Sequence, residues 1–201
     1  MIIGSSIFIK YLGLGVNLWI NELVYLLAPA YFLAKKFNWS WQEVYRFKKV
    51  KKKQLVVAFI GGVSFWFFAG LNSILVERIL NNLFGSTVVN EAIAQNLSSP
   101  LQVIMFLVGM VILAPFCEEV FFRGFLQRAY ASYNKRWGWL IVGILFGVLH
   151  LANGISNFSS AILLGLIMGY LMYITDSIWP SIIWHGANNL TAIAGGSYIQ
   201  Q

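Results

Sequence analysis

Residues 115–124 read PFCEEVFFRG and place three ionisable side chains inside an apolar run that covers residues 101–126. The three are Glu118, Glu119 and Arg123. A charged residue at the centre of a membrane helix costs roughly 2.5 to 3.5 kcal/mol or more, so such residues mark a functional site by default. The run therefore predicts a membrane-spanning helix that carries a functional cluster.

The composition of the whole chain agrees with a membrane location. Of the 201 residues, 59% are hydrophobic and 10% are charged, whereas soluble domains carry about 25% charged residues. About six apolar segments, each of a length that suits a transmembrane helix, fill most of the chain. We predict an all-α fold, a polytopic transmembrane bundle of about six spans with residues 1–201 in a single membrane-embedded domain. The segments are 14–34, 55–76, 101–128, 137–150, 158–173 and a last one that starts at Pro180.

The charge distribution predicts how the bundle is oriented. The net charge is +7, and eight of the 14 lysine and arginine residues lie between residues 35 and 53. Basic loops next to membrane spans remain on the cytoplasmic side and attract anionic lipid. A second basic connector contains Arg128, Lys135 and Arg136. We expect a multi-pass protein of the cell membrane with both connectors cytoplasmic and both termini outside.

Nucleic acid is not expected as a partner, because the basic residues are not interleaved with stacking aromatic side chains in a water-soluble fold. The expected partners are the lipid bilayer and a membrane-associated peptide or protein. Residues 1–12 are apolar but interrupted by polar side chains, and we interpret them as an interfacial segment.

Two further apolar segments carry histidines. His185 and Asn189 are four residues apart and so share one helix face. At 1.5 Å per residue, Glu118 lies roughly 15 Å from Arg128, His150 roughly 16 Å from Trp139 and His185 roughly 10 Å from Ile178. These three starting points mark the basic side of the bundle, so the three side chains lie at a similar depth. Polar groups without partners are costly in lipid, so we expect these side chains to contact one another.

Such a cluster contains the parts needed for amide hydrolysis. A carboxylate and an imidazole can hold and deprotonate a water, while a second imidazole and an amide can donate hydrogen bonds to an oxyanion. Glu118, His150 and His185 could instead bind a divalent metal such as zinc, whose bound water would be the nucleophile. The residues leave both routes open, so the cofactor is unknown from the sequence.

Three motifs resemble those of the CPBP family of intramembrane proteases. They are EExxxR at residues 118–123, FxxxH at 146–150 and HxxxN at 185–189. The family, also called Abi, groups the type II CAAX prenyl endopeptidases with bacterial bacteriocin-processing and self-immunity proteins. The motif-bearing core covers residues 101–194. The resemblance implies an endopeptidase with an intramembrane catalytic cavity that opens toward the cytoplasm.

The resemblance also implies a role for each motif residue. Glu118 matches the catalytic glutamate, and His150 matches its partner in activating water. His185 and Asn189 match the pair that holds the oxyanion. These four residues are the expected catalytic set.

Other polar residues of the spans have structural interpretations. Glu119 and Arg123 match the supporting residues of the first motif, and at positions i and i+4 they would form an ion pair on any helix. Asn17, Asn21 and Glu22 in the first span are interpreted as facing other helices or lying near the headgroups rather than as catalytic.

Two functions of other classes fit the same residues. A non-catalytic bacteriocin self-immunity or regulatory protein would bind a peptide or a partner through the same cavity. A small transporter would use the carboxylates as proton relays. Loss of function in Glu118→Gln would favour catalysis over binding, and proton-coupled flux in liposomes would favour transport.

Overall fold

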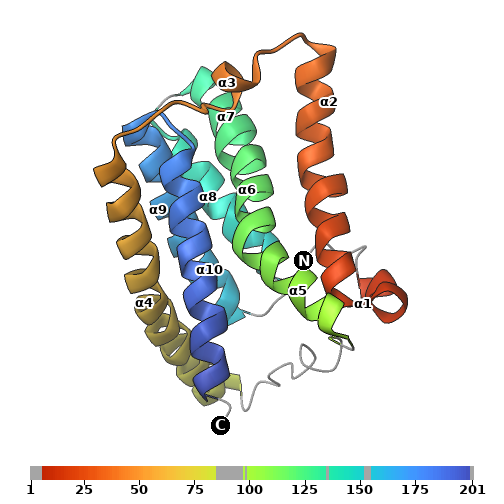
Figure 1. The fold of residues 1–201 in the computed structure, drawn as a ribbon. Helices are drawn as coiled ribbons and strands as arrows, with labels where there is room; N and C mark the ends of the chain where they lie inside the picture. Colours follow the sequence, from red (N-terminus) through yellow and green to blue (C-terminus); the bar gives the residue numbers. More distant parts are fainter. Residues whose placement is uncertain (1–5, 85–96, 98, 135, 152–154, 200–201) are drawn as a thin grey trace.

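The computed structural model describes residues 6–84, 97, 99–134, 136–151 and 155–199, and Figure 1 shows that these ranges form a bundle of helices. Within these ranges every regular element is helical, which confirms the predicted all-α fold. Four helices are long and apolar enough to cross a membrane by length and composition. They are Leu12–Lys36, Lys52–Phe84, Pro100–Tyr133 and Asn157–Thr175.

The first of these helices follows a sharp change of direction at Gly13. Elements α1 (Ser6–Ile20), η1 (Asn21–Leu27) and α2 (Ala28–Lys36) follow one another along the chain, and η1 is a π-helical segment. Gly13 has φ 76° and ψ 163°, a conformation that only glycine adopts easily. Residues 6–12 therefore form a helical piece set off from the span. Residues 1–5, the other part of the expected interfacial segment, lie outside the described residues.

The basic connector after α2 packs back into the bundle. It contains α3 (Trp41–Val44) and the buried Tyr45, whose hydroxyl donates to the carbonyl of Ala30. Arg128 in the second basic connector donates from Nη1 to the carbonyl of Glu43 at 2.7 Å. The two basic connectors therefore lie at the same end of the bundle, as Figure 1 shows. Their assignment to the cytoplasmic side stays a prediction.

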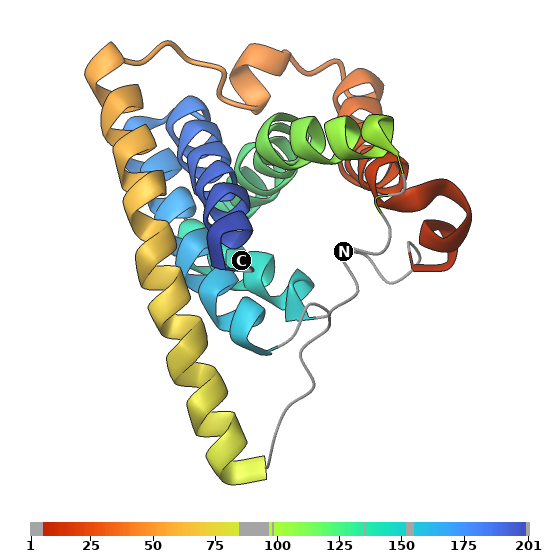
Figure 2. The same ribbon diagram turned by 60° about the horizontal axis from the view of Figure 1, so that its bottom comes forward.

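Helix α4 (Lys52–Phe84) is 33 residues long, so it begins before the predicted segment 55–76 and continues beyond it. The residues that follow Val76 are more polar than those of the segment. Glutamate and arginine are good helix formers, however, and they extend a helix readily once it leaves the hydrocarbon. In Figure 2, α4 lies along one edge of the bundle, with α9 and α10 beside it.

The third segment is one long helix with two widened turns. It comprises α5 (Pro100–Val108), η3 (Gly109–Leu113), α6 (Ala114–Glu119), η4 (Val120–Leu126) and α7 (Gln127–Tyr133). Both η segments are π-helical, a form that commonly appears as a local bulge at functional sites. Pro115 lies in the first turn of α6, directly after η3. The widened turn thus accommodates the proline, which lacks a backbone amide hydrogen.

The last three helices are α8 (Gly138–Leu149), α9 (Ile155–Thr175) and α10 (Trp179–Ile199). Helix α8 has 12 residues, roughly 18 Å of rise, which is less than the roughly 30 Å of membrane hydrocarbon. Helices α8 and α9 approach closely, because a Cβ on Gly165 would lie 2.4 Å from the carbonyl oxygen of Gly143. All six predicted segments are thus helical. Within the described ranges, four helices are long and apolar enough to cross a membrane.

Apolar side chains also cover the outside of the bundle. Phe68 and Leu71 on α4 are each 66% exposed, an arrangement that suits contact with lipid rather than with water. Inside, Phe146 on α8 and Met168 on α9 are fully buried and belong to one core cluster. Side chains of α4, η4, α8 and α9 form this core, and Trp184 of α10 packs against it. The first motif lies on α6 and η4, the second ends at the C-cap of α8, and the third lies on α10.

Candidate active site

The ion pair expected on the third helix is present and fully buried. Glu119 Oε1 accepts a hydrogen bond from Arg123 Nη1 at 3.0 Å, and both side chains are 0% exposed. Arg123 Nη2 also donates to the carbonyl of Gly165 at 3.0 Å, and its guanidinium lies 4.6 Å from the ring centroid of Phe146. Arg123 therefore connects the third helix to α8 and α9.

His185 on α10 lies between the two adjacent carboxylates. Its Nδ1 is 3.2 Å from Glu119 Oε1, and its Nε2 is 3.9 Å from Glu118 Oε2. The carboxylate paired with Arg123 accepts hydrogen bonds, so Nδ1 is the donor in the first contact. The second distance exceeds a direct hydrogen bond but is short enough for one water to contact both atoms.

The two glutamates have different surroundings. Glu119 has no exposed surface, and its Oε1 has a cation and an imidazole as partners, while its Oε2 has no hydrogen-bond partner within the described ranges. Glu118 is 15% exposed, and its buried Oε2 has no hydrogen-bond partner among the residues that the structure describes. One carboxylate of the pair is therefore occupied by structural contacts, and the other is available to a reactant.

His150 stands at the C-terminal end of the short helix α8. Its Nδ1 is 2.8 Å from the carbonyl oxygen of Phe146. A carbonyl can only accept, so Nδ1 carries the proton and Nε2 is the acceptor nitrogen of the neutral ring. His150 also interacts electrostatically with Glu118 and His185. The second motif thus presents a basic nitrogen at the cluster.

Asn189 lies one turn beyond His185 and binds the third helix. Its Nδ2 donates to the carbonyl of Met110 at 2.9 Å. In η3 the amide of Ala114 bonds to the carbonyl five residues back, so Pro115, which has no amide hydrogen, leaves the Met110 carbonyl without its backbone donor. Asn189 replaces that donor with one of its two amide hydrogens.

Glu22 is a further member of the cluster, although the sequence provided no reason to place it with the catalytic residues. It is 5% exposed, and its Oε2 lacks a hydrogen-bond partner within the described ranges. Its carboxyl group interacts electrostatically with Glu118 and with Cys117. Asn17 and Asn21 are also buried. Their spacing along one helix face was the signal that these side chains point into the bundle.

Gln127 was also missed, and it repeats the contact made by Arg123. Its Nε2 donates to the carbonyl of Gly169 at 2.9 Å. Arg123 and Gln127 are four residues apart, as are the two glycines whose carbonyls they bind. The small residues of α9 let these side-chain donors reach its backbone.

The candidate metal ligands do not form a metal site in this arrangement. Among the described residues, no group of three or more histidine, cysteine, aspartate or glutamate side chains is placed to hold a metal ion. Among the three candidate ligands, Glu118 Oε2 and His185 Nε2 lie 3.9 Å apart.

Comparison with known proteins agrees with the three motifs. Residues 100–191 match the family model described as Type II CAAX prenyl endopeptidase Rce1-like. The chain carries an Rce1-like domain. This result confirms the resemblance to the CPBP family. All three motifs lie inside the Rce1-like domain, whereas Glu22 lies before it.

A curated relative of the chain is the uncharacterized protein YyaK of Bacillus subtilis (strain 168). It is 39% identical over an alignment of 98 residues, which covers 43% of this chain and 33% of the relative. The matched region thus spans a third of the length of that relative. No solved structure matches the chain.

Proposed function

We propose that this chain is an intramembrane endopeptidase that hydrolyses a peptide bond in a membrane-associated peptide or protein. The observation that carries the proposal is the contrast between two neighbouring carboxylates. Glu119 is fully buried and its Oε1 accepts hydrogen bonds from Arg123 and His185, while Glu118 is 15% exposed and its Oε2 lies 3.9 Å from the imidazole of His185. Two carboxylates with different surroundings are typical of sites where one supports and the other reacts.

Glu118 and His150 activate the attacking water in this proposal. The Phe146 carbonyl holds the proton of His150 on Nδ1, so Nε2 can accept a hydrogen bond from the water. The water oxygen attacks the scissile carbonyl carbon, and its proton passes to Glu118. Glu118 then gives this proton to the leaving amine as the carbon–nitrogen bond breaks.

His185 and Asn189 stabilise the tetrahedral intermediate. His185 donates from Nδ1 to Glu119, and in the imidazolium form its Nε2–H would donate to the oxyanion. Asn189 uses one amide hydrogen for the Met110 carbonyl and has a second one to donate. Both donors are carried by helix α10, which fixes their separation.

Cleavage of a pooled library of transmembrane peptides by the purified chain in liposomes tests this function, with mass spectrometry as the readout. We expect specific products from the wild type and a loss of roughly 10²- to 10⁴-fold in Glu118→Gln, the usual contribution of a general base. Glu43→Gln, on an exposed position of α3, is the matched control and keeps full activity. Equal cleavage by Glu118→Gln and Glu43→Gln would overturn the assignment.

The same preparation tests the role of a metal. Activity is measured before and after chelation, together with elemental analysis of the purified protein. The proposed route predicts that cleavage survives chelation. Stoichiometric zinc whose removal stops cleavage and whose return restores it would overturn the metal-free route and leave the choice of residues intact.

A further inference from the structure

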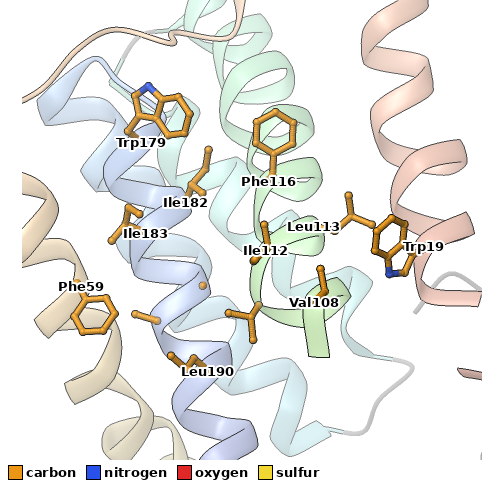
Figure 3. A pocket seen from close by; sticks show the side chains of 13 residues that line it. Trp19, Phe59, Val108, Ile112, Leu113, Phe116, Trp179, Ile182, Ile183 and Leu190 are labelled. Atoms are coloured by element: carbon orange, nitrogen blue, oxygen red, sulfur yellow. The ribbon is translucent and has the colours of Figure 1, made fainter. Parts of the chain in front are cut away.

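An apolar groove runs between the third helix and α10, away from the proposed catalytic residues. Its volume is about 480 Å³, and every residue that lines it is hydrophobic or glycine. Figure 3 shows Trp179 at one end and Leu190 at the other, with Ile112 and Phe116 on the opposite wall. Trp179 and Leu190 are separated by roughly 17 Å of helical rise. None of Glu118, His150, His185 and Asn189 lines the groove.

The groove faces the surroundings of the bundle. Ile112 on the third helix is 64% exposed, Phe59 on α4 is 47% exposed and Leu190 on α10 is 45% exposed. A large apolar surface of this kind marks a site of contact with a protein or with lipid. In a helical membrane bundle, the hydrocarbon that surrounds it is the default occupant.

One end of the groove lies under the first basic connector. Phe47, which belongs to that connector, packs against both walls, with ring centroids 6.0 Å from Phe116 and 5.6 Å from Trp179. On α4, Lys52 precedes Phe59 by seven residues, so the ammonium group lies two turns above a groove residue on the same helix face. The apolar groove thus ends in a basic surface.

The exposed basic residues at this end fall into two groups, those with a carboxylate partner and those without one. Arg46 and Lys48 both pair with Asp176. For the exposed lysines at positions 49 and 51–53, the described part of the chain shows no ion pair. An anion at this position would meet a cluster of cations that the protein itself does not neutralise.

We propose that the groove binds an acyl chain of an anionic phospholipid whose phosphate is held by Lys51 and Lys52. The positive charge at the end of the groove favours an anionic lipid over the other possible occupants. Each lysine near an anionic membrane surface strengthens binding roughly fivefold, an increase that a neutral lipid or an uncharged apolar peptide would not gain. A second copy of the chain docking through this face by two-fold symmetry would bring two lysine clusters together, which repel.

Quenching of tryptophan fluorescence by brominated acyl chains tests the proposal, because Trp179 lines the groove. The full chain is reconstituted in vesicles that contain brominated phosphatidylglycerol or brominated phosphatidylcholine at the same mole fraction. The signal of Trp179 is the difference between the wild type and Trp179→Phe. We expect phosphatidylglycerol to quench Trp179 at a lower mole fraction than phosphatidylcholine does.

Two pairs of matched variants distinguish a specific lipid-binding site from general contact with lipid. Lys51→Gln with Lys52→Gln should reduce the preference for phosphatidylglycerol by roughly 5- to 30-fold, whereas the exposed pair Lys35→Gln with Lys36→Gln should preserve it. Ile112→Phe should fill the groove and reduce quenching. Ile104→Phe, on an exposed position outside the groove, should not.

Three results would overturn the proposal. The first is equal quenching by the two lipids in the wild type. The second is an equal effect of the two lysine pairs on the lipid preference. The third is protection of Trp179 from both lipids, which would indicate a peptide or a second copy in the groove. None of these measurements depends on peptidase activity.

Discussion

Replacing Arg123 with alanine removes the centre of a buried network, and the cost can be worked from its contacts. The guanidinium bonds to Glu119 and to the Gly165 carbonyl, both at 3.0 Å. Removing one partner of a buried ion pair costs about 3 to 5 kcal/mol, because the other charge is left uncompensated. An interhelical hydrogen bond in a membrane protein adds about 0.6 kcal/mol. The expected loss is about 4 to 6 kcal/mol, a large share of the roughly 5 to 15 kcal/mol that stabilises a typical protein.

The assay is equilibrium unfolding in mixed micelles, in which the fraction of sodium dodecyl sulfate is raised stepwise. Arg128→Ala is the matched control, since Arg128 is exposed and surface substitutions usually change stability by about 0.5 kcal/mol or less. Adding Glu119→Gln to Arg123→Ala should restore part of the stability, because the stranded charge is gone.

Either of two results would refute the coupling of Glu119 and Arg123. Arg123→Ala could lose no more stability than Arg128→Ala, or the double variant could lose the sum of both single losses. Either result would mean that Glu119 and Arg123 do not act as a coupled pair.

Three further variants test other contacts through their thermal midpoints. Glu22→Gln should leave the midpoint at or slightly above the wild-type value, because an amide has the shape of the buried carboxyl and carries no charge; a lower midpoint would contradict this. Burial raises the pKa of the Tyr45 hydroxyl above its ordinary value of 10.0, so its stabilising effect is complete below pH 10 and is lost as the pH rises through the folded-state pKa. The wild type should therefore lose stability above pH 10 more steeply than Tyr45→Phe, and parallel curves would contradict the assignment. Asn189→Ala should cost about 1 kcal/mol, and adding Pro115→Ala should recover part of it by returning a backbone donor; an additive loss would show that the two residues are not linked.

Local spacing predicted the contacts that lie on one helix. Glu119 and Arg123 were expected to pair because they are four residues apart, and they do so at 3.0 Å. The shared depth of Glu118, His150 and His185 predicted that three separate helices would meet. The hydrophobic pattern also predicted the six apolar helical segments, because long apolar runs in a membrane have few alternatives to a helix.

Contacts that depend on how helices pack were not predictable in the same way. Glu22 reaches the cluster only because η1 packs against α6, and a single polar residue in a span has many ordinary explanations. The partner of Asn189 depends on the π-helical register before Pro115, which the sequence pattern does not specify. Helix α4 continues past the predicted segment 55–76 for a related reason, since a helix can extend beyond the hydrocarbon wherever its polar residues favour a helix.

The division of labour between Glu118 and Glu119 is the central claim, and measuring cleavage and thermal stability for the two glutamine variants side by side tests it most directly. The predicted result is that Glu118→Gln loses cleavage and keeps the wild-type midpoint, while Glu119→Gln has a lowered midpoint because Arg123 is left without its carboxylate. Equal midpoints for both variants, or full cleavage by Glu118→Gln, would contradict the claim.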